Sequence, residues 1–87
     1  MNKRWEDLAW EEYLTWHEED KKIWKKINAL IKDIERNGVS KGIGKPELLK
    51  HSFAGYWSRR IDEKNRLIYK IDEQGYLYIY SCKEHYK

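Results

Sequence analysis

The chain has 87 residues, enough for one small domain that buries too little surface to be more than marginally stable by itself. Its single cysteine, Cys82, excludes a disulfide framework, and the lack of a long apolar run or of a basic-then-apolar signal segment favours a cytoplasmic protein. The formal net charge of +3 is concentrated in residues 21–60, which carry eleven Lys or Arg against three acids, and such a basic centre suits a polyanionic partner.

Two helices are predicted in the first 37 residues. Residues 6–18 place apolar side chains largely at three- and four-residue steps among acids. These side chains are Leu8, Ala9, Trp10, Tyr13, Leu14 and Trp16. A second apolar stripe follows Asp20, a candidate N-cap, and ends at Asn37-Gly38. It consists of Ile23, Ile27, Leu30, Ile31 and Ile34. The short connection predicts an antiparallel helical hairpin, and most of the five tryptophans are expected in the core.

The second half of the chain is predicted to form strands. Lys3–Trp5 is a short extended start, and the glycines between residues 38 and 44 indicate a loop. Runs rich in Ile, Tyr and Trp follow at about residues 56–61, 66–71 and 76–82. Four-residue polar turns separate these runs, as in a β-meander. We therefore predict one α+β domain over residues 1–87, with two helices followed by an antiparallel sheet.

Two residues have the chemistry for metal-free RNA cleavage. Such cleavage needs a base for the 2′-hydroxyl, an acid for the leaving 5′-oxygen and fixed cations beside the phosphorane. Glu47 follows Pro46 in a lysine-rich loop, where cations would keep a carboxylate ionised, although a surface ion pair is an equally open reading. The imidazole of His85 titrates near neutral pH and can serve as acid or base, the alternative being a frayed surface histidine.

Cations and aromatic rings surround these two residues in the sequence. Arg60 and Arg66 flank the turn between the first two strands, so they should form a phosphate clamp across the hairpin, unless they pair with acids of that turn. Lys45, Lys50 and Arg59 are also expected to contact a polyanion, whereas the helical lysines read as a solvated face. Tyr56 and Tyr86 can stack bases. Trp57 is expected to be buried.

Other chemistries lack support in this sequence. His17, His51 and His85 are spread over the whole chain, which does not match the spacing of a metal site. The glycines before Lys45 do not have P-loop spacing, and no nucleophile-elbow glycines surround a serine. No cofactor is expected.

Widely separated segments resemble, in order and spacing, the YoeB/Txe branch of the RelE toxin superfamily. The segments are Gly44-Lys45-Pro46-Glu47, Leu49-Lys50-His51, Trp57-Ser58-Arg59-Arg60-Ile61, Arg66-Leu67-Ile68-Tyr69 and His85-Tyr86, with Trp5 and residues 10–16 and 25–33 in the N-terminal half. The resemblance covers nearly the whole chain and is more specific than any single motif.

The resemblance implies the toxin of a type II toxin–antitoxin pair, a ribosome-dependent endonuclease that cuts mRNA at the A-site codon. Carried over by motif, Glu47 corresponds to the proposed general base, Arg66 to the group that stabilises the transition state and His85 to the general acid, with Tyr86 orienting the substrate. Residues expected to bind substrate are Lys50, His51, Arg59 and Arg60.

The resemblance also implies a microbial-RNase fold, with two helices on a twisted antiparallel sheet, and no metal. The expected partners are the ribosome with its mRNA, a YefM/Axe-like antitoxin that covers the active site, and a second copy in a homodimer. ParE-type relatives on the same fold inhibit DNA gyrase without cutting RNA. The combination of Glu47, Arg66 and His85 favours the nuclease over this alternative.

Three positions depart from the family pattern. Asn65 stands where relatives commonly have His before the arginine, and residues 37–40 lack the usual Pro-Phe pair. Lys87 extends the chain past a tyrosine that is normally terminal. We expect activity to be retained, with altered affinity for antitoxin or ribosome.

Overall fold

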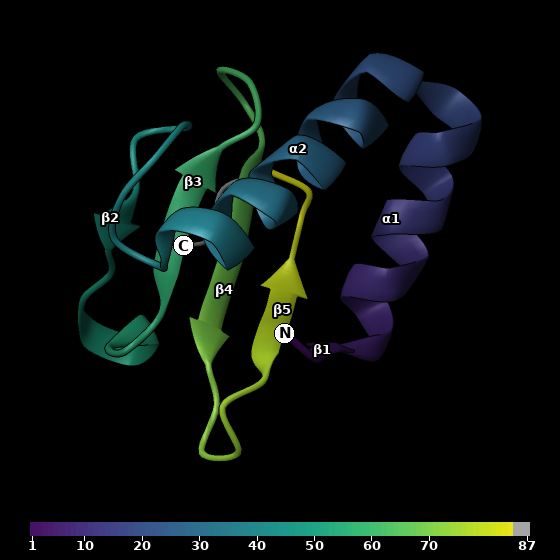
Figure 1. The fold of residues 1–87 in the computed structure, drawn as a ribbon. Coiled ribbons are helices and arrows are strands. Elements are labelled where there is room, and N and C mark those ends of the chain that lie inside the picture. Colours follow the sequence, from purple (N-terminus) through teal and green to yellow (C-terminus); the bar gives the residue numbers. More distant parts are fainter. Residues whose placement is uncertain (85–87) are drawn as a thin grey trace.

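The computed structural model describes residues 1–84 and shows two helices packed on one face of a five-stranded sheet (Figure 1). The elements in chain order are β1 (Lys3–Trp5), α1 (Asp7–Glu19), α2 (Lys21–Asn37), β2 (Glu47–Leu48), a 3-10 helix (His51–Phe53), β3 (Trp57–Arg60), β4 (Arg66–Ile71) and β5 (Leu77–Ser81). The predicted α+β class, the helical hairpin and the three main strands are confirmed. Neither helix in this part of the chain is long and apolar enough to cross a membrane.

The sheet is mixed, with strand order β1-β5-β4-β3-β2. The pairs β2–β3, β3–β4 and β4–β5 are antiparallel, whereas β1 lies parallel to β5. The prediction of a wholly antiparallel sheet was therefore wrong at β1, because the extended start joins the sheet edge rather than leaving it. Glu47 also begins a strand instead of lying in a loop. Strands of two or three residues are too short to show an alternating pattern in sequence.

The second helix matches its prediction closely. Ile27, Leu30 and Ile34 are fully buried against the sheet. The Asp20 carboxylate accepts hydrogen bonds from the backbone N–H groups of Lys22 (3.1 Å) and Ile23 (3.4 Å), as an N-cap residue does. The helix ends at Asn37 and is followed by Gly38 at the C-cap, whose φ of 91° is accessible to glycine.

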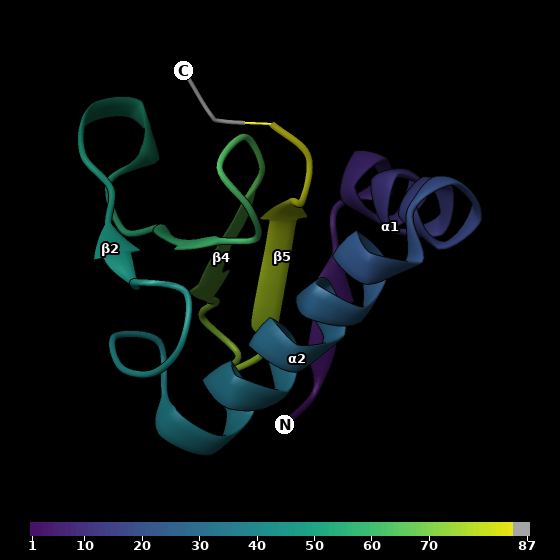
Figure 2. The ribbon, with the colours of Figure 1, turned by 90° about the horizontal axis from the view of Figure 1, so that it is seen from above.

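The first helix is less buried than its apolar pattern indicated. Of its predicted stripe only Ala9 lies in the core, whereas Leu8, Trp10 and Leu14 are 63%, 43% and 47% exposed. The helix packs at the side of the molecule, against α2 and β5, so much of its surface remains open (Figure 2). Trp5, Trp16 and Trp57 pack at the margin of the core, but the expectation that Trp10 belongs to it was wrong.

Candidate active site

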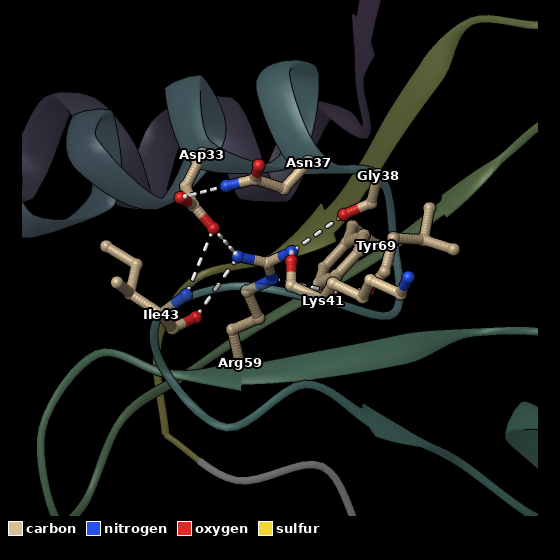
Figure 3. A network of polar contacts seen from close by, with 8 residues as sticks. Asp33, Asn37, Gly38, Lys41, Ile43, Arg59 and Tyr69 are labelled. Carbon is tan, nitrogen blue, oxygen red and sulfur yellow. Dashed lines mark hydrogen bonds and ion pairs between the residues drawn. The ribbon is translucent and has the colours of Figure 1, made fainter.

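A buried arginine holds together the loop that leads to Glu47. The Arg59 side chain is 0% exposed, and its five N–H donors have protein acceptors (Figure 3). The acceptors are the Tyr69 hydroxyl (2.9 Å), the Asp33 carboxylate and the backbone carbonyls of Gly38 (2.8 Å), Lys41 (2.6 Å) and Ile43 (3.1 Å). The Tyr69 hydroxyl in turn donates to the Val39 carbonyl at 2.7 Å. Arg59 therefore fastens residues 38–43 to α2 and β4.

Arg59 must be removed from the predicted substrate-binding residues, because its guanidinium has no exposed surface and no donor left for a phosphate. The sequence contained a signal for this. Arg59 lies two residues from Trp57 and from Ile61, and alternate residues of a strand share one face. Because Trp57 is expected to be buried, Arg59 should lie on the core side of the strand as well. A buried arginine needs a partner such as Asp33.

Two glycines allow this loop to pack tightly. A Cβ at Gly42 would lie 1.8 Å from the Asp33 Oδ2 atom, and one at Gly44 would lie 2.8 Å from a methyl carbon of Leu30. Both glycines have positive φ, +120° and +82°. The Gly44 carbonyl also accepts a 2.7 Å hydrogen bond from the Arg60 N–H. The loop is thereby fixed directly before Lys45-Pro46-Glu47.

The Asp33–Arg59 pair predicts an acid-sensitive part of the stability. The hydrogen bond from Arg59 is the main cause that holds the pKa of the Asp33 carboxyl below its ordinary value of 3.8. Because the folded-state pKa is lowered, the stabilisation is fully present above pH 3.8 and is lost as the pH falls through the folded-state value. The stability difference between wild type and Asp33→Asn should therefore shrink below pH 3.8, as measured by urea unfolding. A constant difference would contradict this role.

Three predicted site residues share the sheet face that the helices do not cover. Glu47 lies opposite Ser58 on β3, and Arg60 lies opposite Arg66 on β4. Side chains directly opposite each other, and those two residues apart on one strand, point to the same face. Glu47, Arg60 and Arg66 therefore point away from the core. The Cα atoms of Glu47 and Arg66 are roughly 12 Å apart by strand geometry, a separation that two long side chains can close around a phosphate.

The two arginines form the predicted pair across the hairpin. Arg60 is exposed. Arg66 is half-buried, and its Nη1 donates to the backbone carbonyls of Asp62 (2.6 Å), Glu63 (3.2 Å) and Asn65 (3.1 Å). These bonds fix the guanidinium over the turn through its Nη1 atom. The two arginines therefore lie opposite each other across the hairpin, and the phosphate clamp remains a prediction.

Asn65 connects this turn to the end of the described chain. Its side chain is nearly buried, donates to the Asp62 carboxylate and accepts a 2.6 Å hydrogen bond from the Glu84 N–H. The Arg66 N–H donates to the Glu84 carbonyl at 3.2 Å. Burial acts to raise the pKa of the Asp62 carboxyl. Hydrogen bonds from the backbone and side chain of Asn65 nevertheless hold this pKa below its ordinary value. Both the turn and Arg66 therefore bind the residue that directly precedes His85.

Helix α1 holds the same segment from its other side. The Trp16 Nε1 donates to the Cys82 carbonyl, and the Cys82 N–H donates to the Glu12 carboxylate, each at 2.9 Å. Burial raises the pKa of the Cys82 thiol to about 12, so this group stays protonated and is no nucleophile at neutral pH. The predicted acid His85 and the orienting residue Tyr86 lie outside the described residues.

The remaining predicted residues follow β2. Lys50 and His51 are exposed, and His51 adopts a positive φ of 58° as it enters the 3-10 helix. Both residues therefore remain accessible, two and three positions after the end of β2. Sequence reasoning missed Asn65 as a site residue, since it was noted only as a departure from relatives. Asp62, three residues before Asn65, was the available signal, because an aspartate at the start of a turn commonly accepts hydrogen bonds from residues later in that turn.

Residues 5–86 match the family described as the YoeB-like toxin of bacterial type II toxin–antitoxin systems. The chain belongs to this family. Toxin YoeB from Escherichia coli is 50% identical over 86 residues, which are 99% of this chain and 100% of that protein. The toxin in the "YoeB-YefM complex from Staphylococcus aureus" superposes with a TM-score of 0.91 at 46% identity, covering 99% of this chain and 98% of that one.

A further solved structure, "The structure of YoeB dimer from Staphylococcus aureus", has a TM-score of 0.91 at 48% identity, with the same shares of the two chains covered. The resemblance stated from the sequence is thereby confirmed. The chain is a toxin of a type II toxin–antitoxin system, and its fold is the fold of that family.

Proposed function

We propose that this toxin is a metal-independent endoribonuclease that cuts mRNA at the codon in the ribosomal A site and so inhibits translation. The observation that carries the proposal is the common orientation of Glu47, Arg60 and Arg66 on the open sheet face. The hydrogen bonds that Asn65 and Arg66 make with Glu84 add support, because they hold the residue that precedes His85 in the sequence at the same turn.

The proposed reaction uses the 2′-hydroxyl of the substrate as nucleophile. Glu47 takes the proton from this hydroxyl, and the freed oxygen bonds to the adjacent phosphorus. The bond from phosphorus to the 5′-oxygen then breaks, and His85 protonates the leaving oxygen. A 2′,3′-cyclic phosphate and a 5′-hydroxyl result. Arg66, with Arg60 across the hairpin, stabilises the charge that develops on the phosphorane.

The other predicted residues would position RNA. Lys50 and His51 lie on the exposed segment after β2, within the same basic region as Glu47. Their role is to bind backbone phosphates near the cleaved bond, while Tyr86 orients the substrate. Because translating ribosomes are the proposed site of action, we also propose a cytoplasmic location.

The proposed partners follow from relatives. The Staphylococcus aureus toxin has been solved with YefM and as a dimer, and we propose a YefM-like antitoxin and a homodimer for this chain too. The antitoxin would neutralise the toxin by covering the face with Glu47 and Arg66. Size-exclusion chromatography with light scattering would detect the dimer, and a stable monomer at micromolar concentration would exclude it.

Glu47→Gln and His85→Ala should each reduce cleavage by roughly 10²-fold or more, because each removes a proton-transfer group. Toeprinting of a defined mRNA on purified ribosomes measures the loss. The matched control is Glu18→Gln, which neutralises an exposed glutamate near the end of α1 and should cut normally. If the wild type leaves the mRNA whole, or the variants cut equally well, the assigned roles are wrong and inhibition of gyrase becomes the next hypothesis.

A further inference from the structure

Aromatic side chains cover the part of the open sheet face that lies beyond Glu47 and the arginines. Phe53, Tyr56 and Tyr80 contact one another edge to face, with ring centroids 5.3–5.7 Å apart. The Tyr78 ring lies 6.5 Å from that of Tyr56. We name these four residues the ring platform. Tyr80 is 36% exposed and the other three are partly exposed, so the rings are accessible from solvent.

An open pocket of about 380 Å³ lies between the ring platform and the β4–β5 turn. The Lys70 ammonium lies 4.6 Å from the Tyr56 ring centroid and 5.9 Å from that of Tyr78, and the Arg4 guanidinium lies 5.8 Å from the Tyr78 centroid. The pocket thus combines aromatic faces with two cations, Arg4 and Lys70, and two acids, Asp72 and Glu73. Its lining residues are Arg4, Tyr56, Lys70, Asp72, Gln74 and Tyr78, with Glu73 at the turn.

The charges in this pocket leave Lys70 available for an anion. Asp72 is already used, since it accepts hydrogen bonds from the N–H groups of Gln74 and Tyr76 at 2.9 Å and pairs with Arg4 at 3.1 Å. Lys70 has no carboxylate within 4 Å among residues 1–84. Its four-carbon stem can swing the ammonium from the tyrosine rings to a phosphate at the mouth of the pocket.

The hydroxyl of Tyr78 is held in its neutral, protonated form. Its hydroxyl donates a hydrogen bond to the Glu6 carboxylate. Burial, assisted by Glu6, raises the pKa of Tyr78 to about 12. The phenol therefore carries no negative charge at neutral pH, and its ring presents an uncharged face to a ligand.

The ring platform is continuous with the proposed catalytic groups. Lys70 follows Arg66 by four residues on β4, and Tyr56, directly before β3, precedes Arg60 by four residues. Both pairs share one face, and each spans about 13 Å along the strand. A single RNA strand that leaves the arginines along this face can therefore reach the pocket within a few nucleotides.

We propose that the ring platform and its pocket form a second RNA subsite, which binds an unpaired nucleotide flanking the cleaved bond. The base stacks on Tyr78, with Tyr56 edge-on beside it, and its phosphate pairs with Lys70. Stacking on aromatic rings accepts every base, so this subsite adds affinity with little sequence preference. The inference rests on the proposed function, because it extends the same substrate path.

RNA chain length and four variants test the subsite. Fully 2′-O-methylated single strands of three and six nucleotides lack the nucleophile and stay intact, and fluorescence anisotropy measures their binding. The wild type should bind the longer strand about tenfold more tightly than the shorter one. Tyr78→Leu and Lys70→Gln should each lose most of this tenfold gain in affinity. Lys70→Gln should also reduce the slope of log affinity against log salt concentration by about 1.

Matched variants separate the subsite from general effects. Tyr78→Phe keeps the ring and loses only the bond to Glu6, so it should retain the gain. Lys32→Gln removes one charge from the exposed face of α2 and should retain it too. A wild type without a length-dependent gain, or platform variants that keep it, overturns the subsite. The subsite is also overturned if Tyr78→Leu and Lys70→Gln lose affinity for the antitoxin but not for RNA.

The ribosome assay distinguishes this failure from failure of the proposed function. If the wild type cuts mRNA but the length-dependent gain is insensitive to Lys70 and Tyr78, only the subsite is wrong. If the gain depends on these residues while the wild type leaves mRNA whole, the subsite stands and the nuclease proposal falls.

Discussion

Arg59→Met should destabilise the protein by about 3–5 kcal/mol, the size expected when one member of a buried ion pair is removed. The substitution leaves the Asp33 carboxylate without its cation and three backbone carbonyls without their donor. Domains of this kind are stable by only about 5–15 kcal/mol in total. Urea unfolding followed by circular dichroism measures the change, and much of the variant is expected to be unfolded at moderate temperature.

The adjacent residue supplies the control for this prediction. Arg60→Met removes the same charge from the same strand, but its side chain is exposed, so stability should stay within about 0.5 kcal/mol of wild type. Cleavage on the ribosome should nevertheless fall, because Arg60 belongs to the proposed clamp. If Arg59→Met unfolds at the same urea concentration as Arg60→Met, the buried network does not stabilise the loop.

The contrast between Arg59 and Arg60 also shows what the sequence can and cannot reveal. Residue type and basic context made the two arginines equivalent candidates for RNA binding. Strand alternation separates them, since Arg59 shares the core side with Trp57. The partner of Arg59 was unpredictable, because Asp33 lies 26 residues earlier on a different element. Long-range side-chain pairs leave no periodic trace in a single sequence.

Regular elements were predictable to the extent that their patterns were long. The stripe of α2 and the three main strands have enough residues for periodicity to decide their type. The exposure of Trp10 and Leu14 was missed, because an apolar pattern does not say how much of a helix its neighbours cover. The parallel pairing of β1 was missed as well, since a three-residue strand takes its partner from tertiary packing.

Asn65→Ala should lower the maximal cleavage rate on the ribosome by about 10–100-fold with little change in KM. The Asn65 side chain holds the Glu84 N–H at 2.6 Å, and Glu84 has a φ of 61°, a conformation unusual for a residue other than glycine. Loss of the acceptor lets this backbone relax. The residue that follows in the chain is His85, whose imidazole must be accurately placed to protonate the leaving oxygen.

Two further variants decide whether Asn65 acts as a positioning residue. Asn65→His introduces the residue common in relatives, whose ring nitrogen can accept from the Glu84 N–H, so it should restore the rate. Lys64→Ala alters an exposed side chain on the same turn and should cut normally. Single-turnover rates at increasing toxin concentration separate the maximal rate from KM, at a temperature where circular dichroism shows every variant folded. An unchanged maximal rate for Asn65→Ala, or a loss that appears only in KM, would mean that the bond to Glu84 stabilises the chain end without serving catalysis.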